Sequence, residues 1–187
     1  MVGYSFDHEF NDTLTVRQNL RYAKVQTDYR SLYGYGVIPG TTTLQRSTAV
    51  SDEDLSSFAV DTQAQAKFAT GAVDHTLLLG VDFQRMHNDI NAGFGYLAGS
   101  SLDLLNPQYS EDAMVTTYPN SVVDKQQQTG LYAQDQIEWD RWVLTLGGRY
   151  DYAMTSVYNR NAAAGTHPLD KRARKSTRLN SSHVAFS

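Results

Sequence analysis

The chain has 187 residues, of which 41% are hydrophobic, and its formal net charge is −4. It contains no cysteine, which excludes a disulfide framework, a thiolate metal site and a cysteine nucleophile. Its longest apolar run, near Leu77 to Leu79, is far shorter than the roughly 20 residues of a membrane-spanning helix. All 20 acidic residues precede Lys171, and so acidic a body argues against a nucleic acid as partner.

Apolar and polar residues alternate along several stretches of the chain, and this period of two indicates β-strands. The clearest stretches, after a shorter one from Gly3 to Phe10, are Leu14 to Tyr22, Phe58 to Phe68, Leu77 to Phe83, Leu131 to Trp139 and Trp142 to Tyr152. Asp135 is a charged exception on the apolar side of its stretch. The sequence therefore predicts about six strands.

Short turns and long connections alternate between these strands. Turn-forming residues make up the short connections at 11–12, 71–74 and 140–141. Long irregular loops are expected at roughly 36–54, which includes the acidic run 52–54, at 92–125, and from 159 onward. The pattern predicts three antiparallel hairpins, approximately 3–35, 54–92 and 126–158, with their tight turns near Asn11, Ala72 and Asp140 at one end of the sheet.

Two architectures produce this pattern. A soluble β-sandwich, such as a carbohydrate-binding module, buries its apolar faces against a second sheet. An outer-membrane β-barrel turns the apolar face to lipid and has short turns at one end, long loops at the other and aromatic girdles. The unequal loops and the aromatic residues near strand ends favour the barrel. Because the smallest membrane barrels need about eight strands, we expect the chain to be a fragment of one.

Several segments resemble a known family in its order and at its spacing. They are Tyr33-Gly34-Tyr35-Gly36-Val37, Asp74 to Phe83, Leu144 to Asp151, and residues 16–21, 58–63, 67–71, 88–92 and 128–132. These segments resemble the barrel of the TonB-dependent ferric-siderophore receptors, of the ferrichrome (ferric hydroxamate) type. The resemblance implies an all-β, antiparallel up-and-down transmembrane barrel of 22 strands in the bacterial outer membrane.

The same resemblance implies the partners. A ferric siderophore would be the ligand, outer-membrane lipid would surround a monomeric barrel, and TonB would act through an N-terminal plug domain absent from this chain. Iron would travel inside the chelate, so no cofactor is expected. The chain departs from the ferrichrome-type receptor that it resembles in two ways, because it has no cysteine pair in the loop after Tyr35 and has Gly93 where a tryptophan would be expected. Both changes fall near the ligand loops and leave the particular siderophore open. The runner-up function is a general porin, or a phage or adhesion surface.

Two aromatic–glycine segments, Tyr33 to Gly36 and Gly93 to Tyr96, are the candidate site. Glycine removes bulk beside each ring, and we expect it to let the backbone bend and the rings project. The resemblance implies that Tyr33, Tyr35, Phe94 and Tyr96 bind the siderophore. In the alternative interpretation, these rings belong to the girdle of aromatic residues at the membrane–water interface.

No catalytic or metal residue is predicted. The five histidines have no metal-ligand spacing, and neither a nucleophile elbow nor a carboxylate pair in a shared pocket is recognisable. Charged residues are instead expected to line the inside of the barrel, namely Arg17, Arg21, Asp61, Lys67, Asp82, Arg149 and Asp151.

Residues 171–187 are assigned apart from the barrel domain, 1–170. The segment 176–187 matches nothing expected in the family and resembles translated sequencing-adapter sequence, so the tail is predicted to be non-native or disordered and outside the fold. The alternative is a natural basic extracellular loop.

Overall fold

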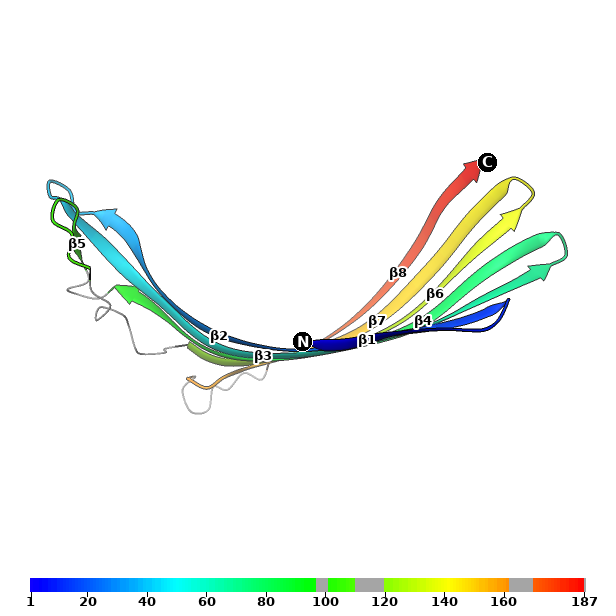
Figure 1. Ribbon diagram of the computed structural model, residues 1–187, viewed down its shortest axis with the longest axis horizontal. Coiled ribbons are helices and arrows are strands. Elements are labelled where there is room, and N and C mark those ends of the chain that lie inside the picture. Colours follow the sequence, from blue (N-terminus) through cyan, green and yellow to red (C-terminus); the bar gives the residue numbers. More distant parts are fainter. Residues whose placement is uncertain (97–100, 110–119, 162–169, 187) are drawn as a thin grey trace.

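The computed structural model describes residues 1–96, 101–109, 120–161 and 170–186, and its strands form one antiparallel sheet, a single curved layer (Figure 1). The strands are β1 (Val2–Asn11), β2 (Leu14–Val37), β3 (Thr43–Thr70), β4 (Val73–Tyr96), β5 (Leu102–Asp103), β6 (Asn120–Trp139), β7 (Trp142–Asn159) and β8 (Asp170–Phe186). Apart from the two-residue β5, which pairs with β3, each strand lies beside its neighbours in chain order. This confirms the predicted all-β, up-and-down fold.

The three tight turns lie together at one end of the sheet (Figure 1). In the first, the Asn11 side-chain oxygen accepts hydrogen bonds from the backbone N–H groups of Thr13, at 2.9 Å, and Leu14, at 2.8 Å. Gly71 and Asp140 have φ of 67° and 54°, a region that Gly, Asn and Asp tolerate best. The hairpins predicted at Asn11, Ala72 and Asp140 are therefore confirmed.

The long loops predicted between these hairpins are wrong in extent. β2 and β3 are joined by residues 38–42 alone, and the acidic run 52–54 lies inside β3. β4 likewise continues to Tyr96, and β6 begins at Asn120. Alternation reveals a strand only where its two faces meet different surroundings. These strand ends carry polar residues on both faces, so the sequence signal fades while the backbone ladder continues.

The basic tail also differs from expectation. Its backbone, Asp170 to Phe186, forms β8 and pairs antiparallel with β7, although the tail is predicted to be non-native or disordered. The edge of β7 offers a long row of backbone N–H and C=O groups, and an extended segment can pair with these whatever its side-chain pattern. The domain boundary at residue 170 and the non-native origin of the tail remain predictions.

The two faces of the sheet differ sharply. On one, the belt face, apolar residues align across strands: Val60 is opposite Phe83, and Leu131 is opposite Tyr150. Leu131 is 56% exposed and Tyr150 is 40% exposed, whereas Val60 and Phe83 are half-buried. Along β3 this belt extends from Phe58 to Phe68, which matches the roughly 9–11 residues with which a strand crosses a bilayer. The other, polar face carries Arg17, Asp61, Asp82 and most other charged residues of these spans.

A conventional core is nearly absent from the described part of the chain. Its buried hydrophobic residues are Val50, Leu102 and Val123. The described strands form one sheet, not the two packed sheets of the soluble β-sandwich alternative. Among the described residues there is no helix of the length and apolarity needed to cross a membrane.

Candidate functional site

The two aromatic–glycine segments lie at the end of the sheet opposite the tight turns, on strands that flank β3. Tyr33 of β2 is opposite Ser47 of β3, which is opposite Tyr96 of β4. Ala49, two residues after Ser47 on β3, is opposite Phe94 of β4. The register is continuous from here down to Asp61, so Tyr33, Phe94 and position 96 lie on the polar face. Two strand spacings, roughly 10 Å, separate Tyr33 from position 96.

Tyr35 is placed differently, because it is the extra residue of a β-bulge. The register of β2 shifts between Gly34 and Gly36, which are opposite Arg46 and Gln45. A bulge bends the strand and re-aims the inserted side chain, and the Tyr35 side chain is 76% exposed. The register of the ladder therefore changes at the first aromatic–glycine segment, whereas β4 stays in register through Gly95 in the second. That the glycines let the backbone bend stays a prediction.

The rings of this site are free for contact. Phe94 is 70% exposed and Tyr33 is 44% exposed, and small side chains, Ser47 and Ala49, occupy the strand between them. The side chain of Tyr96 lies outside the described residues. The structure therefore brings the predicted positions to one end of the sheet, three of them on one face.

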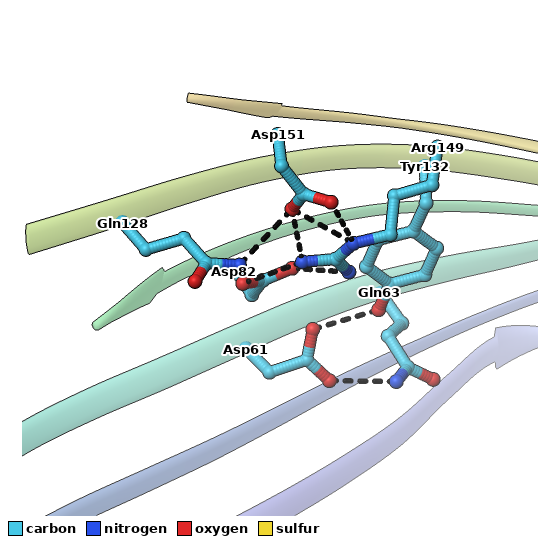
Figure 2. Close-up of polar contacts among 7 residues, drawn as sticks. All are labelled: Asp61, Gln63, Asp82, Gln128, Tyr132, Arg149 and Asp151. Atoms are coloured by element: carbon cyan, nitrogen blue, oxygen red, sulfur yellow. Dashed lines mark hydrogen bonds and ion pairs between the residues drawn. The ribbon is translucent and has the colours of Figure 1, made fainter. Parts of the chain in front are cut away.

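Closer to the tight turns, the polar face carries a connected set of charged and polar side chains (Figure 2). The Arg149 guanidinium is bound on two sides: Nε donates to Asp151 Oδ1 at 2.9 Å, and Nη1 lies 2.7 Å from Asp82 Oδ2. Gln128 also donates to Asp151, at 3.1 Å. Neighbouring this group, Asp61 accepts hydrogen bonds from the Tyr132 hydroxyl at 2.7 Å and from Gln63 at 2.6 Å.

Two glycines make these contacts possible. Tyr132 reaches from β6 across β4 to Asp61 of β3, and it crosses β4 at Gly80, its direct partner in the ladder. A Cβ atom at Gly80 would overlap the Tyr132 ring. In the same way Arg149 crosses β6 at Gly130 to reach Asp82 on β4, and a Cβ there would overlap the guanidinium. The set therefore ties β3, β4, β6 and β7 together through side chains that lie flat on the sheet.

The sequence anticipated the charged members of this set but not Tyr132, Gln63, Gln128 or the two glycines. A glycine within a strand signals close approach by a neighbour, yet the neighbour is known only from the register. Because these carboxylates are paired with Arg149, Tyr132 and Gln63, the arrangement braces the wall and presents no nucleophile with an activating base. Within the described residues there is also no group of three or more His, Cys, Asp or Glu side chains suited to hold a metal ion.

A single antiparallel layer, with a lipid-width apolar belt on one face and a braced polar set on the other, defines the wall of an outer-membrane β-barrel. In such barrels the apolar face is turned to lipid and the polar face to the lumen. The family profile described as "TonB dependent receptor-like, beta-barrel" matches residues 1–186. The chain belongs to this family, and it is a bacterial outer-membrane protein.

Two curated relatives show how close the similarity is. The ferrichrome outer membrane transporter/phage receptor of Escherichia coli K12 is 49% identical over 195 residues, covering 92% of this chain and 26% of that protein. The ferrioxamine B receptor of Salmonella typhimurium SL1344 is 38% identical, covering 83% of this chain and 22% of that receptor. The chain thus spans about a quarter of the length of these relatives. The family is one of transporters and receptors.

Solved structures agree on the fold. The ferric-catecholate import receptor Fiu of E. coli K12, in its closed form, superposes with a TM-score of 0.75 at 20% identity, over 96% of this chain and 29% of that one. The ferric preacinetobactin receptor BauA of Acinetobacter baumannii superposes with a TM-score of 0.72 at 16% identity, over 94% of this chain and 26% of BauA. Both likenesses concern architecture alone.

Proposed function

We propose that the chain supplies part of the wall and mouth of a receptor that binds ferric siderophores of the hydroxamate type and imports them with energy transmitted by TonB. The observation that carries this proposal is the group of exposed rings at the end of the barrel wall away from the tight turns. Tyr33 and Phe94 lie on the lumen face there, and Tyr35 stands out on a bulge. The relatives named for ferrichrome and ferrioxamine B support the choice of hydroxamates.

The chemistry of these rings suits such a ligand. A ferric hydroxamate is compact and nearly neutral, and its surface exposes carbonyl oxygens and apolar backbone. Tyrosine offers a flat apolar ring and a hydroxyl donor, and it loses little rotamer entropy on binding. Iron is cargo inside the chelate, so the protein needs no resident metal or cofactor. In this proposal the barrel is monomeric, performs no catalysis and couples to TonB through a plug domain outside this chain.

The test is to place the chain in a complete barrel. A chimera is built in which residues 1–170 replace the matching segment of the E. coli ferrichrome transporter, in cells that lack their own hydroxamate receptors. We expect TonB-dependent uptake of ⁵⁵Fe-ferrichrome or ⁵⁵Fe-ferrioxamine B. A barrel that reaches the outer membrane, shown by its heat-modifiable mobility in gels, but binds neither chelate would contradict the proposal and leave the porin alternative.

A phage or adhesion surface is a second candidate. It is favoured by apolar side chains that project from the segment after β5, where Leu105 is 81% exposed and Tyr109 is 79% exposed. Phage adsorption to cells that carry the chimera, with Leu105→Ser as the variant, tests it separately from iron uptake. Adsorption that the variant does not reduce would count against this surface.

A further inference from the structure

A hollow in the lumen face lies between the rings at the mouth and the tight-turn end of the wall. One part, of about 440 Å³, is lined by residues of β1 to β4, and a second part, of about 370 Å³, continues from it towards β6 and β7. The two parts share Arg21, Ala59 and Gln84. These three residues form one row across β2, β3 and β4, with Ala59 in the middle.

The hollow exists because the side chains on its floor are small. Gly3 and Ser5 of β1, Ser57 and Ala59 of β3 and Ala153 of β7 line it. Arg21 and Gln84 rise on either side of Ala59, and both are exposed on the lumen face. Their backbones are two strand spacings apart, roughly 10 Å, which leaves room between a guanidinium and a primary amide.

Some polar side chains around the hollow already have a hydrogen-bond or ion-pair partner, and others do not. On the side of the hollow nearer the tight turns, Asp61 is bound by Tyr132 and Gln63, and Asp82 is bound by Arg149. Arg21 and Gln84, by contrast, make no side-chain hydrogen bond or ion pair with any described residue. The two carboxylates are therefore already paired, whereas the guanidinium of Arg21 and the amide of Gln84 have donors that no described residue binds. A ligand that fits this hollow is rich in oxygen acceptors and carries no positive charge.

We propose that this hollow is a second subsite for the ferric hydroxamate, deeper in the lumen than the mouth, where Arg21 and Gln84 donate hydrogen bonds to the chelate's oxygens during import. The inference rests on the proposed function. Arg21 precedes Tyr33 on β2, and Gln84 precedes Phe94 on β4, in each case by roughly 30–40 Å along the strand. The hollow thus lies on the path from the mouth towards the periplasm, and its volume is of the order of small-molecule sites.

The test separates binding at the mouth from passage through the lumen. In the chimera, Arg21→Met and Gln84→Leu remove the donors and keep side-chain bulk, and Arg17→Met is the matched control. Arg17 lies on the same strand and face, but its guanidinium is already paired with Asp7 at 2.7 Å. Two quantities are measured with ⁵⁵Fe-ferrichrome and ⁵⁵Fe-ferrioxamine B: equilibrium binding to de-energised cells and the initial uptake rate in energised cells.

We expect the double variant Arg21→Met/Gln84→Leu to lower the uptake rate about five-fold or more while binding changes by less than about two-fold, with Arg17→Met near wild type in both. Unchanged uptake would overturn the subsite, and so would an equal loss of binding and uptake. Slower uptake with new sensitivity to a large antibiotic such as vancomycin would also overturn it, because Arg21 and Gln84 would then anchor a lumen-filling domain. An unsubstituted chimera that binds neither chelate defeats the proposed function itself, which is a separate outcome.

Discussion

His75 and Asp135 form a pair on the lipid-facing side of the wall, with Nδ1 of the histidine 2.8 Å from Oδ2 of the aspartate. They lie on adjacent strands, β4 and β6, and their side chains are only 16% and 25% exposed. The Phe68 ring stacks on the imidazole with centroids 4.8 Å apart and planes at 8°. Asp135 interrupts the apolar side of its strand, and this pairing explains how a carboxylate is tolerated there.

The first prediction concerns this pair. His75→Leu alone should destabilise the barrel by about 1–2 kcal/mol, because it leaves a carboxylate without its partner next to lipid. His75→Leu/Asp135→Leu should recover most of that loss, since replacing both partners with apolar groups removes the polar group that needs satisfaction. Urea unfolding of the purified chimera in detergent measures both. A double variant no more stable than the single one would contradict the pairing.

A second prediction concerns Arg149, which Asp82 and Asp151 bind from two sides. Arg149→Met should cost about 2–3 kcal/mol, because two largely buried carboxylates lose their counter-ion. Arg149→Lys should recover little of this, since an ammonium cannot reproduce the planar fork of donors. The same unfolding assay applies, and Arg17→Met is the control. The exposed ion pair of Arg17 should contribute less than about 1 kcal/mol, so equal losses in both variants would argue against a braced network.

The third prediction tests the crossing at Gly80. Gly80→Ala should force the Tyr132 ring off the strand and break its hydrogen bond to Asp61, at a cost of about 1 kcal/mol or more. In a Tyr132→Ala background the same substitution should cost much less, and the difference appears in a double-mutant cycle. Gly36→Ala is the control, because no atom lies within 4 Å of its added Cβ. Equal costs of Gly80→Ala in the two backgrounds would show that the ring does not depend on the glycine.

A fourth prediction concerns pH at the end of the wall away from the tight turns. Both guanidinium Nη atoms of Arg160, just after β7, donate to the Asp89 carboxylate of β4 at 2.6 Å. These hydrogen bonds hold the pKa of Asp89 below its ordinary value of 3.8. Because the folded pKa is depressed, the pair stabilises this segment above about pH 3.8 and is lost as the pH falls through the lower, folded value.

Hydrogen exchange near residue 160 in the chimera, followed from pH 6 to pH 2 and corrected for intrinsic rates, should therefore rise at the acid end. Arg160→Gln should show the faster exchange already at pH 6 and little further change. If wild type and Arg160→Gln had the same pH profile, the ion pair would not hold the segment.

The fifth prediction addresses the rings at the mouth. Tyr35→Ala and Phe94→Ala in the chimera should each weaken ferric-siderophore binding by ~1 kcal/mol or more, about five-fold in Kd, the scale of losing one aromatic anchor. Heat stability in detergent should stay unchanged, because both side chains are exposed. Tyr152→Ala, an exposed aromatic on the belt face, should leave affinity unchanged. Wild-type affinity in both mouth variants would assign these rings to the interfacial girdle.

Much of the architecture was readable from the sequence, because lipid and lumen impose opposite demands on alternate residues. The belt from Phe58 to Phe68 and the turns at Asn11, Gly71 and Asp140 follow from that contrast and from turn chemistry. Beyond the bilayer both faces of a strand meet water, so alternation did not show that β3 begins at Thr43, although the predicted ends of β2 and β4, at 35 and 92, lie close to Val37 and Tyr96.

Contacts between strands were decided only by the tertiary structure. Strand register determines that Tyr132 crosses Gly80 to reach Asp61, that Asp135 meets His75, and that Arg21 and Gln84 flank Ala59. No local pattern specifies these pairings, since partners lie on strands far apart in the chain and a one-residue slip would exchange the two faces. Within the belt, the sequence by itself determined which face each residue takes, because alternate residues meet lipid and lumen, and the ladder between strands decided which residues meet there.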